Sequence, residues 1–269
     1  MYYKYINPTD ENDMRFLVNN ELFFSNPKKW ETDKEYEFEF EKINYEKLYD
    51  DLLGIFINIY NDDKILYLKV VDNFNNLLPN DFTYLEQFDQ LICNHIVMNI
   101  KSHKNEYLQG LKKKYYEKTG IFCLSNIKNS SALWDYKKDD RSNCICVGID
   151  KDLLINFLKL QKNIVCKDVV YYDKGNIPKK NINNFSDENK KVLEFLEIAF
   201  SLPNKLINEK ETRIVKVFPN GEENERIIIL PNNLYKEVIF SEGMEKELID
   251  SIKSICFNKG INNFDSQIL

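Results

Sequence analysis

The chain has 269 residues, of which 43% are hydrophobic and 30% charged, a composition typical of a folded globular protein and not of a disordered one. Its 37 Lys and Arg residues and 43 Asp and Glu residues give a net charge of -6, which excludes binding to DNA or to anionic membranes through bulk charge. No apolar run reaches the roughly 18 residues of a membrane span, and the first residues lack the apolar stretch of a signal peptide. We therefore expect a cytoplasmic protein with no membrane partner.

The first half of the chain passes from strand patterns to helix patterns. Its expected elements, in order, are a strand at 2–6, a helix at 10–20, a strand at 21–25, a loop or ragged strand at 28–40, a helix at 45–60, a segment at 64–71 that fits either a strand or a helix, and a helical stretch at 82–118 broken near Gly110. Because apolar residues recur at helical spacing in this region, we expect residues 45–118 to form a helical insertion packed on a β core.

The second half consists mostly of strands with helices between them. Its expected elements, in order, are strands at 121–125 and 144–149, a helix from its cap Asp150 to about residue 160, a strand at 166–172, a loop at 173–185, a helix at 187–200, strands at 211–218, 226–230 and 237–240, and a helix at 242–257. The turn residue Gly221 predicts that strands 211–218 and 226–230 form a hairpin. The pattern as a whole predicts a single α+β domain over residues 1–269, with a mixed β-sheet core.

The cysteines and histidines limit which metal sites and catalytic mechanisms the chain can have. The six cysteines form no C-x-x-C pair, and we interpret them as buried free thiols in a reducing compartment. Only Cys144-x-Cys146 approaches the spacing of a zinc site, and it has no second pair nearby, so no metal site is predicted. The two histidines, His95 and His103, fit no metal motif, and their scarcity disfavours Ser-His-Asp and Cys-His hydrolases. No glycine-rich phosphate-binding motif is present.

Three clusters of aromatic and polar residues are candidates for ligand binding, and each also has an ordinary structural interpretation. In the Tyr3-Lys4-Tyr5 cluster, the tyrosines can pack inward while the lysine faces outward. The serine and asparagine that end the second strand can cap a turn or present polar groups to a ligand. A Trp and a Tyr after the 121–125 strand can stack on a base or nicotinamide ring, or can fill an edge of the core. The candidate binding residues are Lys4, Tyr5, Ser25, Asn26, Trp134 and Tyr136.

A fourth cluster supplies the candidate catalytic residues. Spacing of two places Glu209, Glu211 and Arg213 on one face of a strand. Such a row usually forms a surface ion-pair ladder that adds little stability. Its functional alternative is a pair of carboxylates, held by the arginine, that stabilises a developing oxocarbenium ion in glycosidic chemistry.

Taken in order, these clusters resemble the bacterial family called domain of unknown function 2971. The resemblance rests on Tyr3-Lys4-Tyr5, on Leu22 to Pro27, on Phe122 to Ser125, on Leu133-Trp134 with Tyr136, on Cys144 to Asp150, on Glu209-x-Glu211-x-Arg213 and on Glu237 to Phe240. It spans nearly the whole chain, although each motif alone is weak. Two family features are missing: the Asn-Asp-Pro-Phe-Glu segment, and the histidine of a Trp-x-His-Tyr element, which is shortened here to Trp134-Asp135-Tyr136.

The arrangement of motifs is also similar to ADP-ribosyltransferase folds, an analogy at the level of the fold. That likeness implies NAD as a substrate, with Lys4 or Tyr5, then Ser25, near the cofactor and Glu211 near the ribose. It implies an ADP-ribosyltransferase or NAD glycohydrolase, acting as a toxin or anti-phage defence effector, with a macromolecular ADP-ribose acceptor or a regulatory partner protein. Two alternatives stay open: a metal-dependent nuclease-type effector that uses the Glu-x-Glu pair, and a non-catalytic sensor or interaction module.

Overall fold

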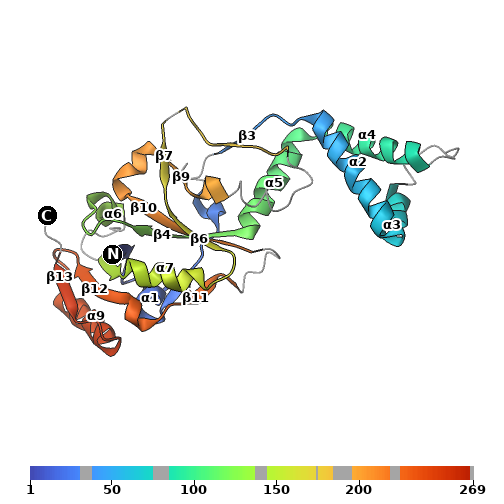
Figure 1. The fold of residues 1–269 in the computed structure, drawn as a ribbon. Coiled ribbons are helices and arrows are strands. Elements are labelled where there is room, and N and C mark those ends of the chain that lie inside the picture. The colour runs from blue at the N-terminus through green and yellow to red at the C-terminus, as the bar shows by residue number, and fades with distance from the viewer. Residues whose placement is uncertain are drawn as a thin grey trace. The chain divides into compact units, whose positions relative to one another are not determined.

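The computed structural model describes residues 1–30, 38–74, 85–136, 144–173, 175–183, 196–218 and 225–266 (Figure 1). They belong to two compact units. The first comprises Met1–Glu37, Tyr115–Pro178 and Leu196–Leu269, and the second comprises Phe38–Lys114 and Lys179–Phe195. The prediction of a single domain over residues 1–269 stays a prediction.

A seven-stranded sheet forms the centre of the first unit, in the order β13-β12-β5-β1-β4-β10-β6. All neighbouring strands are antiparallel except β12 and β13, which are parallel. The strands are β1 (Tyr2–Ile6), β4 (Thr119–Ser125), β5 (Ile145–Ile149), β6 (Ile164–Asp168), β10 (Glu211–Val217), β12 (Tyr235–Phe240) and β13 (Asn263–Ser266). The expected α and β fold with a large mixed sheet is thus confirmed.

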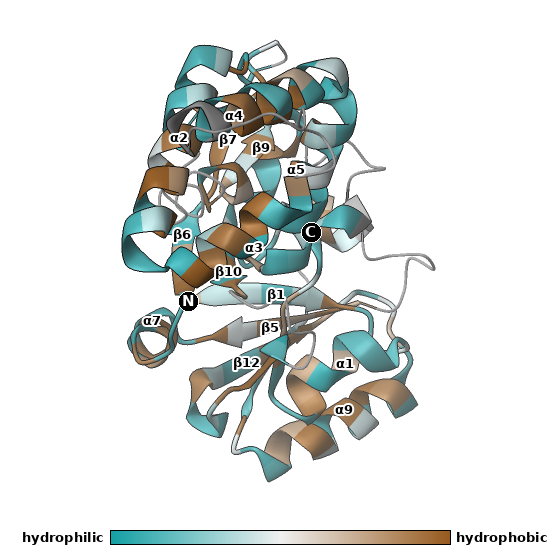
Figure 2. Ribbon diagram, turned by 90° about the vertical axis from the view of Figure 1, so that its right-hand side faces the viewer, coloured by the Kyte–Doolittle hydropathy of each residue, from teal (hydrophilic) through white to brown (hydrophobic). Residues whose placement is uncertain are grey.

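Three helices pack on one face of this sheet, namely α1 (Glu11–Val18), α7 (Lys151–Lys159) and α9 (Lys246–Asn258). Their buried residues join one hydrophobic cluster with Tyr2 and Ile6 of β1, and Figure 2 shows α1 and α9 beside strands β5 and β12. The alternate residues of β1, Tyr3 and Tyr5, face the other way and pack with Trp134 of α6 (Ser131–Tyr136). The two clusters therefore lie on opposite faces of the sheet.

Side-chain caps explain where two of these helices begin. Asp10 accepts a hydrogen bond from the backbone N–H of Asn12 at the start of α1. Asp150 accepts from the backbone N–H groups of Asp152 and Leu153, which confirms the cap predicted for that helix.

Two small sheets and several short helices complete the first unit. Strand β2 (Glu21–Phe23) pairs with β11 (Ile227–Ile229), and β7 (Val170–Tyr172) pairs with β9 (Ser201–Pro203). The short 3-10 helices are η1 (Pro27–Trp30), η3 (Asn204–Glu209) and η5 (Asn232–Leu234). The predicted hairpin between 211–218 and 226–230 is wrong: both edges of β10 are occupied, by β4 and β6, so β11 pairs with β2 instead.

The sheet separates between β1 and β4. These two strands share a single register pair, Tyr3 with Ser125. At its other end β4 forms a bridge with the chain after β2, where Ser25 and Ile121 exchange two backbone hydrogen bonds of 2.9 Å. Because β4 has β1 beside one end and Ser25 beside the other, a gap opens between them.

The second unit is mainly helical, with α2 (Tyr45–Asp62), α3 (Lys64–Phe74), α4 (Leu85–Ser102), most of α5 (Lys104–Lys118) and the short strands β3 (Glu39–Phe40) and β8 (Lys179–Lys180). The segment that fitted either state, 64–71, is helical, and Asp63 caps it by accepting from the N–H groups of Ile65 and Leu66. The break expected near Gly110 lies at His103 instead, between α4 and α5. The helix predicted at 187–200 lies mostly outside the described residues. No helix in the described ranges is both long and apolar enough to cross a membrane.

Candidate functional site

A cleft of about 550 Å³ lies in the first unit where β1 and β4 separate. This volume is within the roughly 300–1,000 Å³ of ordinary small-molecule sites. Strand β10 forms part of its wall, and α1 and β2 form another part. Its charged lining residues are Lys4, Asp10, Asp13, Arg15, Glu21, Glu209, Glu211 and Arg213.

Glu211 and Arg213 form a buried ion pair in the wall of the cleft. Only 7% of Glu211 and 2% of Arg213 is exposed. Arg213 Nε donates to Glu211 Oε1 at 2.9 Å and Nη2 approaches Oε2 at 3.4 Å, while Nη1 donates to the Ala199 carbonyl at 2.7 Å. The guanidinium therefore fixes both oxygens of the carboxylate. This pair is not the exposed ladder that the usual interpretation of the pattern described.

Cys123 lies opposite Arg213 on the neighbouring strand and also lines the cleft. Burial raises the pKa of its thiol, and the nearby Glu211 carboxylate raises it further, outweighing the opposite effects of Arg213 and Lys4. The thiol is therefore protonated at neutral pH and is a poor nucleophile.

Lys4 occupies the gap between the separated strands. Its Nζ donates to the Cys123 carbonyl at 3.0 Å and lies 4.4 Å from the centre of the Phe122 ring. The ammonium thus satisfies a carbonyl of β4 where β1 no longer pairs with it, and it contributes a positive charge to the cleft.

Ser25, which follows β2, and Glu209, the last residue of η3, line the same cleft. Glu209 ends η3 and does not lie on β10, because Lys210 takes a left-handed conformation (φ 44°) between the two elements. The expectation of three alternating residues on one strand is wrong at this position. The two glutamates nevertheless line one cleft, as the functional interpretation requires.

Two predicted binding residues serve the fold. The Tyr5 hydroxyl lies 2.8 Å from the Lys128 carbonyl and 3.1 Å from the Ile127 carbonyl, and it accepts the Ser130 N–H at 3.0 Å. Its ring meets Trp134 edge to face at 5.1 Å, and Tyr5 is also among the residues that line the cleft. Trp134 is only 1% exposed and does not line the cleft, so its position matches the core-filling interpretation.

The remaining two predicted binding residues are Asn26, which is not among the residues that line the cleft, and Tyr136. Asn26 accepts the N–H of Lys28 at 2.9 Å, which matches the turn-capping interpretation. The side chain of Tyr136 lies outside the described part of the chain, so its predicted stacking role stays a prediction.

Sequence reasoning missed one whole wall of the cleft. The sequence pattern predicts Asp10, Asp13 and Arg15 only as parts of a helix and Glu21 and Phe23 only as parts of a strand, yet all five line the cleft. The alternation of β2 was the available signal, because it turns Leu22 inward and leaves Glu21 and Phe23 on the other face.

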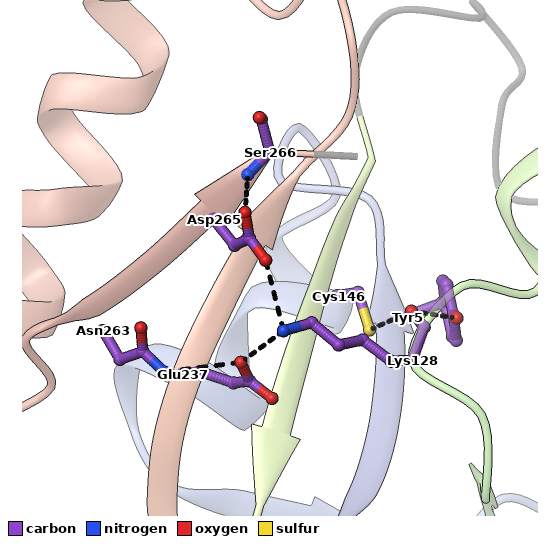
Figure 3. Close-up of polar contacts among 7 residues, drawn as sticks. All are labelled: Tyr5, Lys128, Cys146, Glu237, Asn263, Asp265 and Ser266. Atoms are coloured by element: carbon purple, nitrogen blue, oxygen red, sulfur yellow. Dashed lines mark hydrogen bonds and ion pairs between the residues drawn. The ribbon is translucent and has the colours of Figure 1, made fainter. Parts of the chain in front are cut away.

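A polar cluster is centred on Lys128, Glu237 and Asp265 (Figure 3). Tyr3, which lines the cleft, interacts with the Glu237 carboxylate of this cluster. Lys128 Nζ lies between the Glu237 and Asp265 carboxylates, at 2.9 and 3.2 Å, and Asn263 Nδ2 lies 3.5 Å from Glu237. Burial raises the pKa of Tyr3, and the Glu237 carboxylate raises it further. The cluster joins β13 to β12 and to the loop that carries Lys128.

The lining of the cleft is acidic, with five carboxylates against three cations. This charge favours a ligand or reaction intermediate with positive character. Within the described residues, no group of three or more His, Cys, Asp and Glu side chains is placed to hold a metal ion. Comparison with known proteins found no matching family model, curated protein or solved structure.

Proposed function

We propose that this protein cleaves the nicotinamide–ribose bond of NAD, as an NAD glycohydrolase or ADP-ribosyltransferase. The observation that carries the proposal is the buried Glu211–Arg213 pair facing a cleft that also contains Glu209, Ser25 and Lys4. Breaking an N-glycosidic bond builds positive charge on the ribose, and a fixed carboxylate stabilises that charge.

The cleft supports this chemistry in a second way. The nicotinamide group of NAD is already cationic while bonded, so it leaves as a neutral molecule and needs no general acid. Both histidines of the chain lie on or between helices α4 and α5, and neither lines the cleft. Oxocarbenium stabilisation by a carboxylate is therefore a reaction that this set of residues can support without a histidine.

The roles of the lining residues follow from their positions. Glu211 stabilises the ribose cation, Arg213 fixes the orientation of Glu211, and Glu209 orders water or an acceptor group. Lys4 and Arg15 supply positive charge for the pyrophosphate, and Ser25 supplies a hydroxyl. The likeness to domain of unknown function 2971 and to ADP-ribosyltransferase folds is part of this proposal.

The proposed setting is the cytoplasm, where NAD is available. All six cysteines are free, as expected for a reducing compartment. An enzyme that consumes NAD would act as a toxin or antiviral defence effector, either by depletion or by modifying a macromolecular acceptor.

The test compares nicotinamide release by the wild-type protein, Glu211→Gln and the matched control Glu247→Gln, which changes an exposed glutamate of α9. We expect the wild type and the control to release nicotinamide equally and Glu211→Gln to lose about a hundredfold or more in kcat. Mass spectrometry distinguishes free ADP-ribose from protein adducts. Unchanged turnover by a folded Glu211→Gln protein would overturn the proposal.

A further inference from the structure

Phe23 is an aromatic residue that the fold leaves uncovered beside the cleft. It lines the cleft and is 41% exposed, whereas the preceding residue, Leu22, is fully buried. Its direct partner across the β2–β11 pair is Ile227, which is 40% exposed. Because directly opposite residues of antiparallel strands place their side chains on one face, the two form an apolar surface next to the acidic lining.

Glu21 lies on the same face of β2, two residues before Phe23, and also lines the cleft. Asn19 Nδ2 donates to Glu21 Oε1 at 3.1 Å, and Arg15 Nη1 lies 3.8 Å from Oε2. Oε2 is shielded from water, yet it accepts no hydrogen bond from any part of the chain that the structure describes.

A shielded carboxylate oxygen without a hydrogen bond is costly. The Glu21 side chain as a whole is 17% exposed, so a rotation of its carboxylate brings this oxygen to the cleft, where a ligand N–H donor removes that cost. The aromatic surface beside it accepts the flat face of a ring, an arrangement that gives affinity without requiring a particular base. The two features therefore describe one ligand: a flat ring with an N–H donor at its edge.

We propose that Phe23 and Glu21 form a subsite for a heteroaromatic ring with an exocyclic amino or carboxamide group. The ring lies on Phe23, and its N–H group donates to the Glu21 carboxylate, whose Oε2 turns toward the cleft when the ligand binds. This inference rests on the proposed function, since NAD carries two such rings, adenine with an amine and nicotinamide with a carboxamide. It adds the residues that select the ring, which neither the sequence patterns nor the catalytic pair assigns.

The test measures ring binding and needs no turnover. Adenosine and nicotinamide are titrated separately against the wild type, Phe23→Ala and Glu21→Gln by calorimetry or NMR. The matched control is Phe257→Ala, which removes an exposed phenylalanine of α9 that does not line the cleft. Thermal melting confirms that each variant is folded.

We expect one of the two rings to bind the wild type and the control equally. Phe23→Ala should weaken that binding by about fivefold or more, the range of stacked bases, and Phe23→Tyr should retain it. Replacing the donor on the ligand, with inosine for adenosine or nicotinic acid for nicotinamide, should weaken binding to the wild type. Glu21→Gln should reduce this discrimination. The ring that binds identifies which end of NAD the subsite holds.

Two results would overturn the subsite: binding of neither ring by the wild type, or equal ring affinity for the wild type, Phe23→Ala and Glu21→Gln. Either result, together with turnover that Glu211→Gln abolishes, would reject the subsite and leave the proposed function standing. Ring binding that depends on Phe23 and Glu21, without nicotinamide release from NAD, would support the subsite and reject the proposed function.

Discussion

The Glu211–Arg213 pair shows that the energetic contribution of an ion pair depends on its burial. On an exposed strand, a Glu and an Arg two residues apart contribute little. Here both side chains are almost fully withdrawn from water, and each side chain fixes the position of the other. Removing one partner leaves the other charge buried, which costs far more than the pair itself contributes.

Because losing one partner costs more than losing both, we can predict the outcome of a double-mutant cycle. Arg213→Met should lower the free energy of unfolding by about 3–5 kcal/mol, because Glu211 is then buried without its guanidinium. Adding Glu211→Leu should recover part of that loss, since no buried charge is left over. Urea unfolding of the wild type, both single variants and the double variant measures the coupling. Strictly additive effects would show that the two side chains do not stabilise each other.

Gly148 is a second residue whose identity is required by a close contact. It lies between Tyr3 of β1 and Glu237 of β12 in the sheet. A Cβ at this position would meet Glu237 Cγ at 2.6 Å and Met1 Cε at 3.1 Å. The buried Glu237 side chain can therefore cross the strand only because residue 148 is a glycine.

Gly148→Ala should therefore destabilise the protein by roughly 1–3 kcal/mol, the usual cost of overpacking. The matched control is Gly110→Ala inside α5, where a Cβ meets no atom within 4 Å. That change should stabilise the helix by up to about 1 kcal/mol. Thermal melting of both variants gives the comparison, and a loss of stability in Gly110→Ala alone would contradict the packing described here.

At the scale of elements, the last strand is held by charge as well as by its backbone ladder. β13 pairs only with β12 in the described sheet, and Lys128 joins Asp265 of β13 to Glu237 of β12. The hydrogen bond from Lys128 lowers the pKa of Asp265, with a further contribution from the Ser266 N–H. Hydrogen bonding to Glu237 raises the pKa of Lys128, so its charge persists well above neutral pH.

The direction in which the pKa of Asp265 is shifted determines how the stability of β13 depends on pH. A lowered pKa in the folded state gives a stabilisation that is complete above the ordinary aspartate value of about 4 and is lost as pH falls through the lowered value. We therefore expect the amides of 263–266 to lose hydrogen-exchange protection in acid, after correction for the intrinsic rate. Asp265→Asn should show weaker protection with less change over this pH range. Identical profiles for the two proteins would contradict the role given to this contact.

The elements also show what the sequence could and could not reveal. Strong patterns, such as those of β1, β4, β5 and α7, were predicted close to their observed bounds. Strand pairing was not predicted correctly. Strand β11 could pair with β10 only if one edge of β10 were free, and β4 and β6 occupy both of these edges. The short α6 and the polar β13 carry too little apolar periodicity to be detected, and both were missed.

The residues of the candidate site likewise fall into those that the sequence could identify and those that it could not. Spacing identified Glu211 and Arg213, whereas Lys4 and Ser25 were assigned to the same site only by the likeness to ADP-ribosyltransferase folds, and all four line the cleft. The wall formed by α1 and β2 could not be assigned, because a charged face of a short helix usually faces only water. Likewise, no local pattern distinguishes a Trp that stacks on a ligand from one that packs on Tyr5.

At the scale of the whole molecule, each unit has hydrophobic clusters of its own. The first unit contains the cluster that covers one face of the sheet, to which Ile214 belongs, and the smaller cluster that includes Trp134. The second contains one cluster around Phe56, Tyr67 and Ile92 and another around Leu48. The proposed site lies entirely within the first unit.

Separate cores predict separate opening of the two units. Ile92→Ala and Ile214→Ala remove equivalent amounts of buried aliphatic side chain, from α4 and from β10. Each should cost about 2–5 kcal/mol locally. In Ile92→Ala, hydrogen-exchange protection should fall in α2, α3 and α4 and persist in β4, β5 and β10, and Ile214→Ala should give the reverse pattern. Since the cleft belongs to the sheet unit, only Ile214→Ala should also weaken ligand binding there. Loss of protection throughout the chain in both variants would instead show that the two units open as one cooperative body, as the prediction of a single domain requires.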